Sequence, residues 1–108
     1  MRSIAVLLLA FCSSAHAINY SGAGMSCAEI GGFAQSVAYQ KQMKDGVTLK
    51  EALDGMHSSL SGNDFKSTEK VLAQIINEIY KRPYLSKLDP EVVKSTFEHD
   101  CEVRKQFH

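Results

Sequence analysis

The residues of this sequence with the clearest chemistry are its cysteines, at positions 12, 27 and 101. Cys27 and Cys101 lie far apart and neither belongs to a Cys-x-x-Cys motif, so catalysis by a thiol is not indicated. In an oxidising compartment, two such cysteines form a structural disulfide. We therefore predict that Cys27 bonds to Cys101 and joins the two ends of the folded region.

The compartment is predicted from the start of the chain. Residues 1–17 have the order of a secretory signal peptide: a positive start, a short apolar run and an Ala-His-Ala site ending at Ala17. The apolar run is shorter than the roughly 20 residues of a transmembrane helix. A lipoprotein acylated at Cys12 is the alternative, but Phe11 stands where such sites have a small residue. Cleavage after Ala17 removes Cys12, leaves an even pair of cysteines and predicts a periplasmic or secreted protein.

The densest polar cluster, Glu98-His99-Asp100-Cys101-Glu102, surrounds the last cysteine. On a helix Glu98 and Glu102 share a face with His99 nearby, and this set could bind a metal ion weakly. A structural zinc site needs four ligands at recognisable spacing, which the sequence does not offer. We interpret the cluster as a solvated face beside the disulfide, and we predict no metal, no cofactor and no catalytic residue.

A second polar segment combines cations with aromatic rings. Tyr80, Lys81, Arg82 and Tyr84 surround the rigid turn at Pro83. Tyrosine and arginine are enriched among the residues that dominate protein interfaces, so this segment is the best candidate in the sequence for contact with a partner protein. The favoured interpretation is nevertheless an ordinary helix end, because cations stabilise the negative end of a helix dipole.

Four helices are predicted to position these residues, because apolar side chains recur at helical spacing in four segments. Ser26 with Glu29, and Thr48 with Glu51, form capping boxes at the first two starts, and Asp89-Pro90 marks the fourth. The predicted helices span about residues 27–44, 49–60, 64–81 and 90–107.

Two glycine-containing segments interrupt this pattern. Residues 18–25 contain two glycines and no periodicity, so they are predicted to be a flexible arm before a helical domain of residues 26–108. Gly31 and Gly32 lie inside the first helix, where a glycine pair either lets another backbone approach closely or is a weak point.

The predicted bridge constrains the topology. Cys27 lies in the first turn of the first helix and Cys101 in the later half of the fourth, and a disulfide holds the two Cα atoms within about 7 Å. In an up-and-down arrangement these positions meet at one end only when the number of helices is even. The predicted fold is therefore all-α, a small antiparallel four-helix bundle closed by one disulfide.

Charge and motif content exclude several functions. The 12 basic and 12 acidic residues balance, so no strong field favours nucleic acid or an anionic membrane. No P-loop, G-x-S-x-G, H-E-x-x-H or dinucleotide-binding motif occurs. We therefore predict that the protein is not an enzyme, binds no nucleic acid and has no stable membrane insertion after cleavage.

Several short elements occur together behind the signal peptide. They are Ser26-Cys27-Ala28-Glu29-Ile30, Asp45-Gly46-Val47-Thr48-Leu49, Ile79-Tyr80 with Pro83-Tyr84, and Phe97 before Cys101. In this combination the chain resembles small uncharacterised exported proteins of proteobacteria and their prophages. The resemblance implies a compartment outside the cytoplasm and a helical fold, and it implies no activity.

Two functions from different classes agree with these predictions. The favoured one is a small exported helical binding module that docks on another envelope protein, as an inhibitor or immunity-type partner of a cell-wall enzyme or toxin. The alternative is a periplasmic holdase chaperone that opens in acid and exposes apolar surface, driven by protonation of its histidines and carboxylates.

Overall fold

A computed structural model describes residues 18–43, 46–60 and 66–106 of the chain. Its elements are the 3₁₀ helix η1 (Tyr20–Ala23) and the helices α2 (Cys27–Gln42), α3 (Leu49–Ser59), α4 (Lys66–Lys81), α5 (Pro83–Ser86) and α6 (Pro90–Gln106). The predicted all-α fold with four long helices is confirmed within these ranges. The predicted signal peptide and the predicted start of the third helix lie outside the described residues.

The predicted capping residues set the starts of three helices. Ser26 Oγ accepts a hydrogen bond from the backbone N–H of Glu29 at 3.1 Å, and Glu29 Oε1 accepts one from the N–H of Ser26 at 2.9 Å. The same exchange occurs at the start of α3, at 3.0 and 3.1 Å. Asp89 Oδ1 accepts from the N–H of Glu91 at 3.0 Å. These bonds satisfy N–H groups that have no partner inside their helix.

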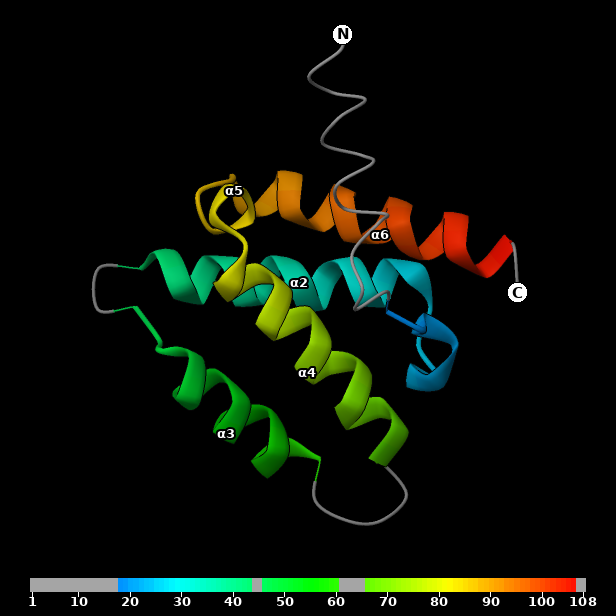
Figure 1. Ribbon diagram of the computed structural model, residues 1–108, viewed down its shortest axis with the longest axis horizontal. Helices are drawn as coiled ribbons and strands as arrows, with labels where there is room; N and C mark the ends of the chain where they lie inside the picture. The colour runs from blue at the N-terminus through cyan, green and yellow to red at the C-terminus, as the bar shows by residue number, and fades with distance from the viewer. Residues whose placement is uncertain (1–17, 44–45, 61–65, 107–108) are drawn as a thin grey trace, which may run out of the picture.

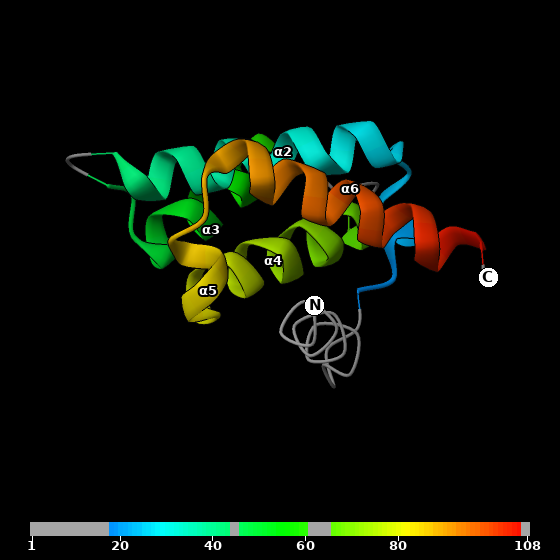
Figure 2. The ribbon, with the colours of Figure 1, turned by 90° about the horizontal axis from the view of Figure 1, so that it is seen from above.

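Helices α2 and α6 form the centre of the fold. They lie side by side and run in opposite directions (Figures 1 and 2), so the start of α2 meets the later part of α6. A disulfide joins Cys27 to Cys101 there, with the Cα atoms 5.5 Å apart, and the predicted bridge is present. Helix α4 crosses one face of this pair. The apolar core between them includes Ile30, Ala34, Ile75, Ile79, Val93 and Phe97.

Helix α3 lies at the edge of the fold (Figure 1). It packs along α4, and no other described helix contacts it to a similar extent. Near its start, the Tyr80 hydroxyl donates to the carbonyl oxygen of Val47. Near its end, Nδ1 of His57 lies 3.3 Å from Oε2 of Glu69. The arrangement therefore differs from a bundle in which every helix packs on two neighbours.

The prediction of a flexible arm over residues 18–25 is wrong. Tyr20–Ala23 form η1, which packs against α4 and α6, and Ile18, Tyr20 and Ala23 are buried. Gly24, with φ of 65°, turns the chain toward α2 in a conformation that glycine adopts without strain. A single 3₁₀ turn is too short to show a helical period, which explains why the sequence pattern missed it.

Gly31 allows the close approach of α2 and α6. A Cβ atom on Gly31 would lie 2.9 Å from the carbonyl oxygen of Lys94 and 3.1 Å from Cβ of Glu98, whereas one on Gly32 would meet nothing within 4 Å. The interpretation that a glycine here lets another backbone approach closely is therefore confirmed for Gly31.

Alanine at the two glycines is expected to have opposite effects on stability. Gly31→Ala should lower the free energy of unfolding by about 1–3 kcal/mol, because the added methyl group overpacks the contact with α6. Gly32→Ala should raise it by about 0.5–1 kcal/mol through helix propensity. Urea unfolding of both variants measures these changes, and equal effects of the two would show that Gly31 has no special contact.

Candidate functional site

The two tyrosines of the predicted partner contact are engaged inside the fold. The ring of Tyr80 is half-buried, its hydroxyl donates to Val47, and Nζ of Lys41 lies 5.1 Å from the ring centre. Tyr84 is also half-buried and packs against the core. The structure therefore uses both rings to hold α4 and α5 against their neighbours.

The two cations of the predicted contact remain together. Lys81 and Arg82 line a hollow of about 480 Å³ on α4 and the start of α5. Its other lining residues are Gln74, Asn77, Glu78 and Pro83. Nε of Arg82 donates to Oε2 of Glu78 at 2.6 Å, and both side chains are mostly buried. The exposed Lys81 is therefore the cation that this hollow offers to solvent.

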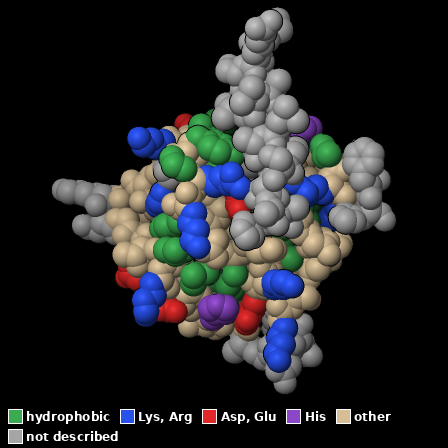
Figure 3. All heavy atoms as spheres, viewed as in Figure 1, with side chains coloured by type: hydrophobic (Ala, Val, Ile, Leu, Met, Phe, Trp, Pro, Cys, Tyr) green, Lys and Arg blue, Asp and Glu red, His purple; other side chains and the backbone are tan. Residues whose placement is uncertain are grey.

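Figure 3 shows Lys and Arg side chains scattered over the visible face, without a single basic patch.

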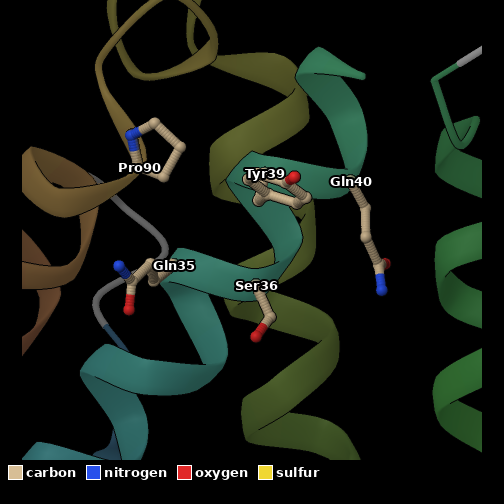
Figure 4. A pocket seen from close by; sticks show the side chains of 5 residues that line it. All are labelled: Gln35, Ser36, Tyr39, Gln40 and Pro90. Atoms are coloured by element: carbon tan, nitrogen blue, oxygen red, sulfur yellow. The ribbon is translucent and has the colours of Figure 1, made fainter. Parts of the chain in front are cut away.

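A second hollow, of about 240 Å³, lies between α2 and the start of α6. We call it the Tyr39 surface; its lining residues are Gln35, Ser36, Tyr39, Gln40 and Pro90. Figure 4 shows the ring of Tyr39 between Pro90 on one side and Gln40 on the other. The Tyr39 side chain is 61% exposed, and Met43, one turn further along the chain, is 53% exposed. The five residues that line the hollow carry no charge, and exposed tyrosine and methionine side chains are typical of the centre of a protein interface.

Tyr39 is not among the functional residues predicted from the sequence. Ile30, Ala34 and Ala38 define the buried face of α2, and Tyr39 falls on the other side of the helix. The sequence does contain a signal for this surface. Tyr39 and Met43 are large apolar residues four positions apart on the side of the segment opposite its apolar stripe.

A buried polar network lies beside the disulfide. The Tyr20 hydroxyl donates to Oδ2 of Asp100 at 2.5 Å, and Nε of Arg104 lies 3.0 Å from both oxygens of the same carboxylate. Tyr20 is 1% exposed and Asp100 is 8% exposed. The interpretation of Asp100 as part of a solvated face is therefore wrong, although His99 and Glu102 are exposed. The carboxylate is buried because it binds two partners at once, one from η1 and one from α6.

The network of Tyr20, Asp100 and Arg104 has a structural role, because it holds η1 against α6. Burial, and then the negative charge of Asp100, raise the pKa of Tyr20 far above its ordinary value. The hydroxyl therefore keeps its proton and remains the donor to Asp100 over the physiological range. This bond fixes η1 against α6 next to the Cys27–Cys101 bridge.

The described residues contain no group of three or more His, Cys, Asp and Glu side chains placed to hold a metal ion. None of the described helices is long and apolar enough to cross a membrane. Comparison of the chain with protein-family models, curated proteins and solved structures finds no match. The described residues show a small helical protein closed by one disulfide.

Acid is expected to weaken the starts of α2 and α3. Hydrogen bonds from the backbone and then the side chain of Ser26 lower the pKa of Glu29, and those from Thr48 lower the pKa of Glu51. A carboxylate with a lowered pKa contributes stability above its unfolded pKa of 4.5 and loses that contribution as the pH falls through its folded pKa. Glutamine keeps the accepting oxygen without titrating.

The corresponding test compares wild type with the double variant Glu29→Gln/Glu51→Gln. Urea midpoints at pH 6 and pH 3 should differ less for the variant than for wild type. An equal loss in both proteins would show that these two carboxylates do not contribute to the acid response.

Proposed function

We propose that the chain is an exported binding module that docks on another protein of the cell envelope through the Tyr39 surface. The observation that carries this proposal is the side chain of Tyr39, which is 61% exposed on a long helix. Its neighbours Gln35, Ser36 and Gln40 supply neutral hydrogen-bonding groups around it. A neutral, partly apolar patch on a folded partner is the complementary surface.

Two features support the proposal of an exported scaffold that the Cys27–Cys101 disulfide closes. Residues 1–17 have the order of a signal peptide, and disulfides persist outside the cytoplasm. We infer that the four long helices form an antiparallel bundle, which the opposite directions of α2 and α6 support (Figure 2). A clamped scaffold loses little conformational freedom on binding, and this favours affinity. We propose that the module acts as an inhibitor or immunity-type partner of an envelope enzyme or toxin.

The Tyr39 surface is favoured over the hollow at Lys81 because of its composition. Interface centres are enriched in aromatic residues and methionine and depleted in lysine and glutamate. The hollow at Lys81 has Glu78, Lys81 and Arg82 in its lining, and Arg82 already has Glu78 as a partner. Lys81 therefore provides a matched comparison site on the same molecule.

Site-specific photocrosslinking in the native host tests the proposal. A photoreactive amino acid at position 39 should give a discrete adduct with one envelope protein, and the same group at position 81 should give little of it. With the partner purified, Tyr39→Ala should raise the Kd at least about tenfold, whereas Lys81→Ala should change it less than about twofold. A protein that forms no adduct at position 39, or an unchanged Kd for Tyr39→Ala, would contradict the proposal.

A second candidate, an acid-stress holdase, is favoured by two observations. The capping carboxylates Glu29 and Glu51 have lowered pKa values. Among the described long helices, α3 packs extensively only on α4. Loss of α3 in acid would expose apolar surface to a client protein. Dye binding and far-UV circular dichroism from pH 7 to pH 2 test this function, and a molecule unchanged at pH 2 excludes it.

A further inference from the structure

We propose that α3 detaches from α4 as a unit while α2, α4, α6 and η1 stay folded, so that α3 is a removable cover over one stripe of α4. This inference does not depend on the Tyr39 surface, and it describes at neutral pH the detachment of α3 that the second candidate function invokes in acid. It rests on how little α3 buries, on where its polar contacts lie, and on a glycine in its middle.

Helix α3 contributes little to the core. Within its 11 residues, all of them described, Met56 is the one fully buried side chain, and Leu49, Ala52 and Leu53 are partly buried against the core. By comparison, α4 buries Val71, Leu72, Ile75, Ile76 and Ile79. Elements with few buried apolar contacts open at a lower free energy than the rest of a protein. The expected first step of local unfolding is therefore the loss of α3.

The stripe under α3 follows from the contacts at its two ends. Tyr80 contacts the chain just before α3, and Glu69 contacts His57 near the end of α3. Ala73 and Ile76 lie between them on the same face of α4, at helical positions i+4 and i+7 from Glu69. Ile76 is 1% exposed in the closed form. Detachment of α3 uncovers this apolar stripe.

The remaining contacts of α4 do not depend on α3. Thr68 Oγ1 donates to the carbonyl oxygen of Ala23 at 2.9 Å, which ties α4 to η1. Helix α4 also packs on α2 and α5, and the Cys27–Cys101 bridge holds α2 to α6. The part that remains after α3 leaves is therefore cross-linked and has its own core.

Gly55 provides a way to change α3 alone. A Cβ atom on Gly55 would meet nothing within 4 Å, so no close contact requires a glycine there, and its effect is to weaken the helix. A helix of this length does not persist alone in water. When α3 detaches it therefore melts, and its amide hydrogens exchange with solvent.

Native-state hydrogen exchange of the oxidised protein tests the proposal with two variants. Gly55→Ala should slow exchange of the α3 amides about two- to fivefold, the factor that corresponds to the helix propensity of alanine over glycine. Gly32→Ala, which adds the same methyl group to an equally open position in α2, should slow exchange in α2 and leave the rates in α3 unchanged.

The result that overturns the proposal is equally specific. If Gly32→Ala slows the α3 amides by the same factor as the α2 amides, α3 opens only with the whole molecule. An unchanged rate in α3 for Gly55→Ala would also contradict it. Both variants favour helix, so both are expected to fold, and the test needs no partner protein. Its outcome is therefore separate from that of the crosslinking experiment at Tyr39.

Discussion

Replacement of both Cys27 and Cys101 by alanine is expected to lower the free energy of unfolding by about 4–5 kcal/mol. The bridge closes a loop across 74 positions of sequence, and the loss of this constraint raises the entropy of the unfolded chain. Small domains have a total stability of about 5–15 kcal/mol. The variant should therefore retain a small fraction of the stability of the oxidised protein. Urea unfolding followed by circular dichroism measures the difference.

Reduction provides the control for this prediction. A thiol reductant should move the urea midpoint of wild type toward that of the Cys27→Ala/Cys101→Ala variant and leave the variant unchanged. A difference between oxidised and reduced wild type below about 1 kcal/mol would show that the bridge contributes much less than loop closure predicts.

Asp100→Ala is expected to have the next largest effect, a loss of about 3–5 kcal/mol. The substitution leaves the buried hydroxyl of Tyr20 and the guanidinium of Arg104 without their shared carboxylate. Glu102→Ala, two residues away and exposed, is the matched control and should change stability by less than about 0.5 kcal/mol. Similar losses for the two variants would contradict the role given to the network.

The same network predicts a response to alkali. Because the folded pKa of Tyr20 is raised, its contribution to stability is fully present below the unfolded pKa of about 10 and is lost as the pH rises above that value. The loss from one such group is about 1.4 kcal/mol per pH unit. Tyr20→Phe should reduce the steepness of this loss between pH 10 and 11, and an unchanged steepness in this variant would contradict the role given to Tyr20.

Local signals in the sequence were enough to predict the long helices and their starts. Ser26 with Glu29, and Thr48 with Glu51, form the predicted capping boxes because each involves residues three apart in the chain. The disulfide was also predictable, because it is the pairing that remains once Cys12 is assigned to a signal peptide. Cys27 lies at the start of α2 and Cys101 in the later half of α6, and an even number of long helices in the described chain brings these two positions to the same end.

The features that the sequence did not predict depend on contacts between distant residues. Tyr20 and Asp100 are 80 positions apart, and no local pattern reports that a tyrosine in a glycine-rich segment will bury a carboxylate of the last helix. The edge position of α3 depends on how α4 crosses the α2–α6 pair, which amphipathic periodicity does not specify. Tyr80 and Tyr84 were candidates for a partner contact, and both rings are half-buried because of neighbours that local sequence does not reveal, such as Val47 for Tyr80.

Export of the chain and its closure by the Cys27–Cys101 bond are the two proposals that most need a direct test. Intact-mass measurement of the protein recovered from the periplasm without reductant, before and after treatment with a thiol-alkylating reagent, tests both directly. An exported protein closed by this bond should have the mass of residues 18–108, lower by two hydrogen atoms, with no alkylation until the protein is reduced. A mass that retains residues 1–17, or alkylation of both cysteines before reduction, would contradict these proposals.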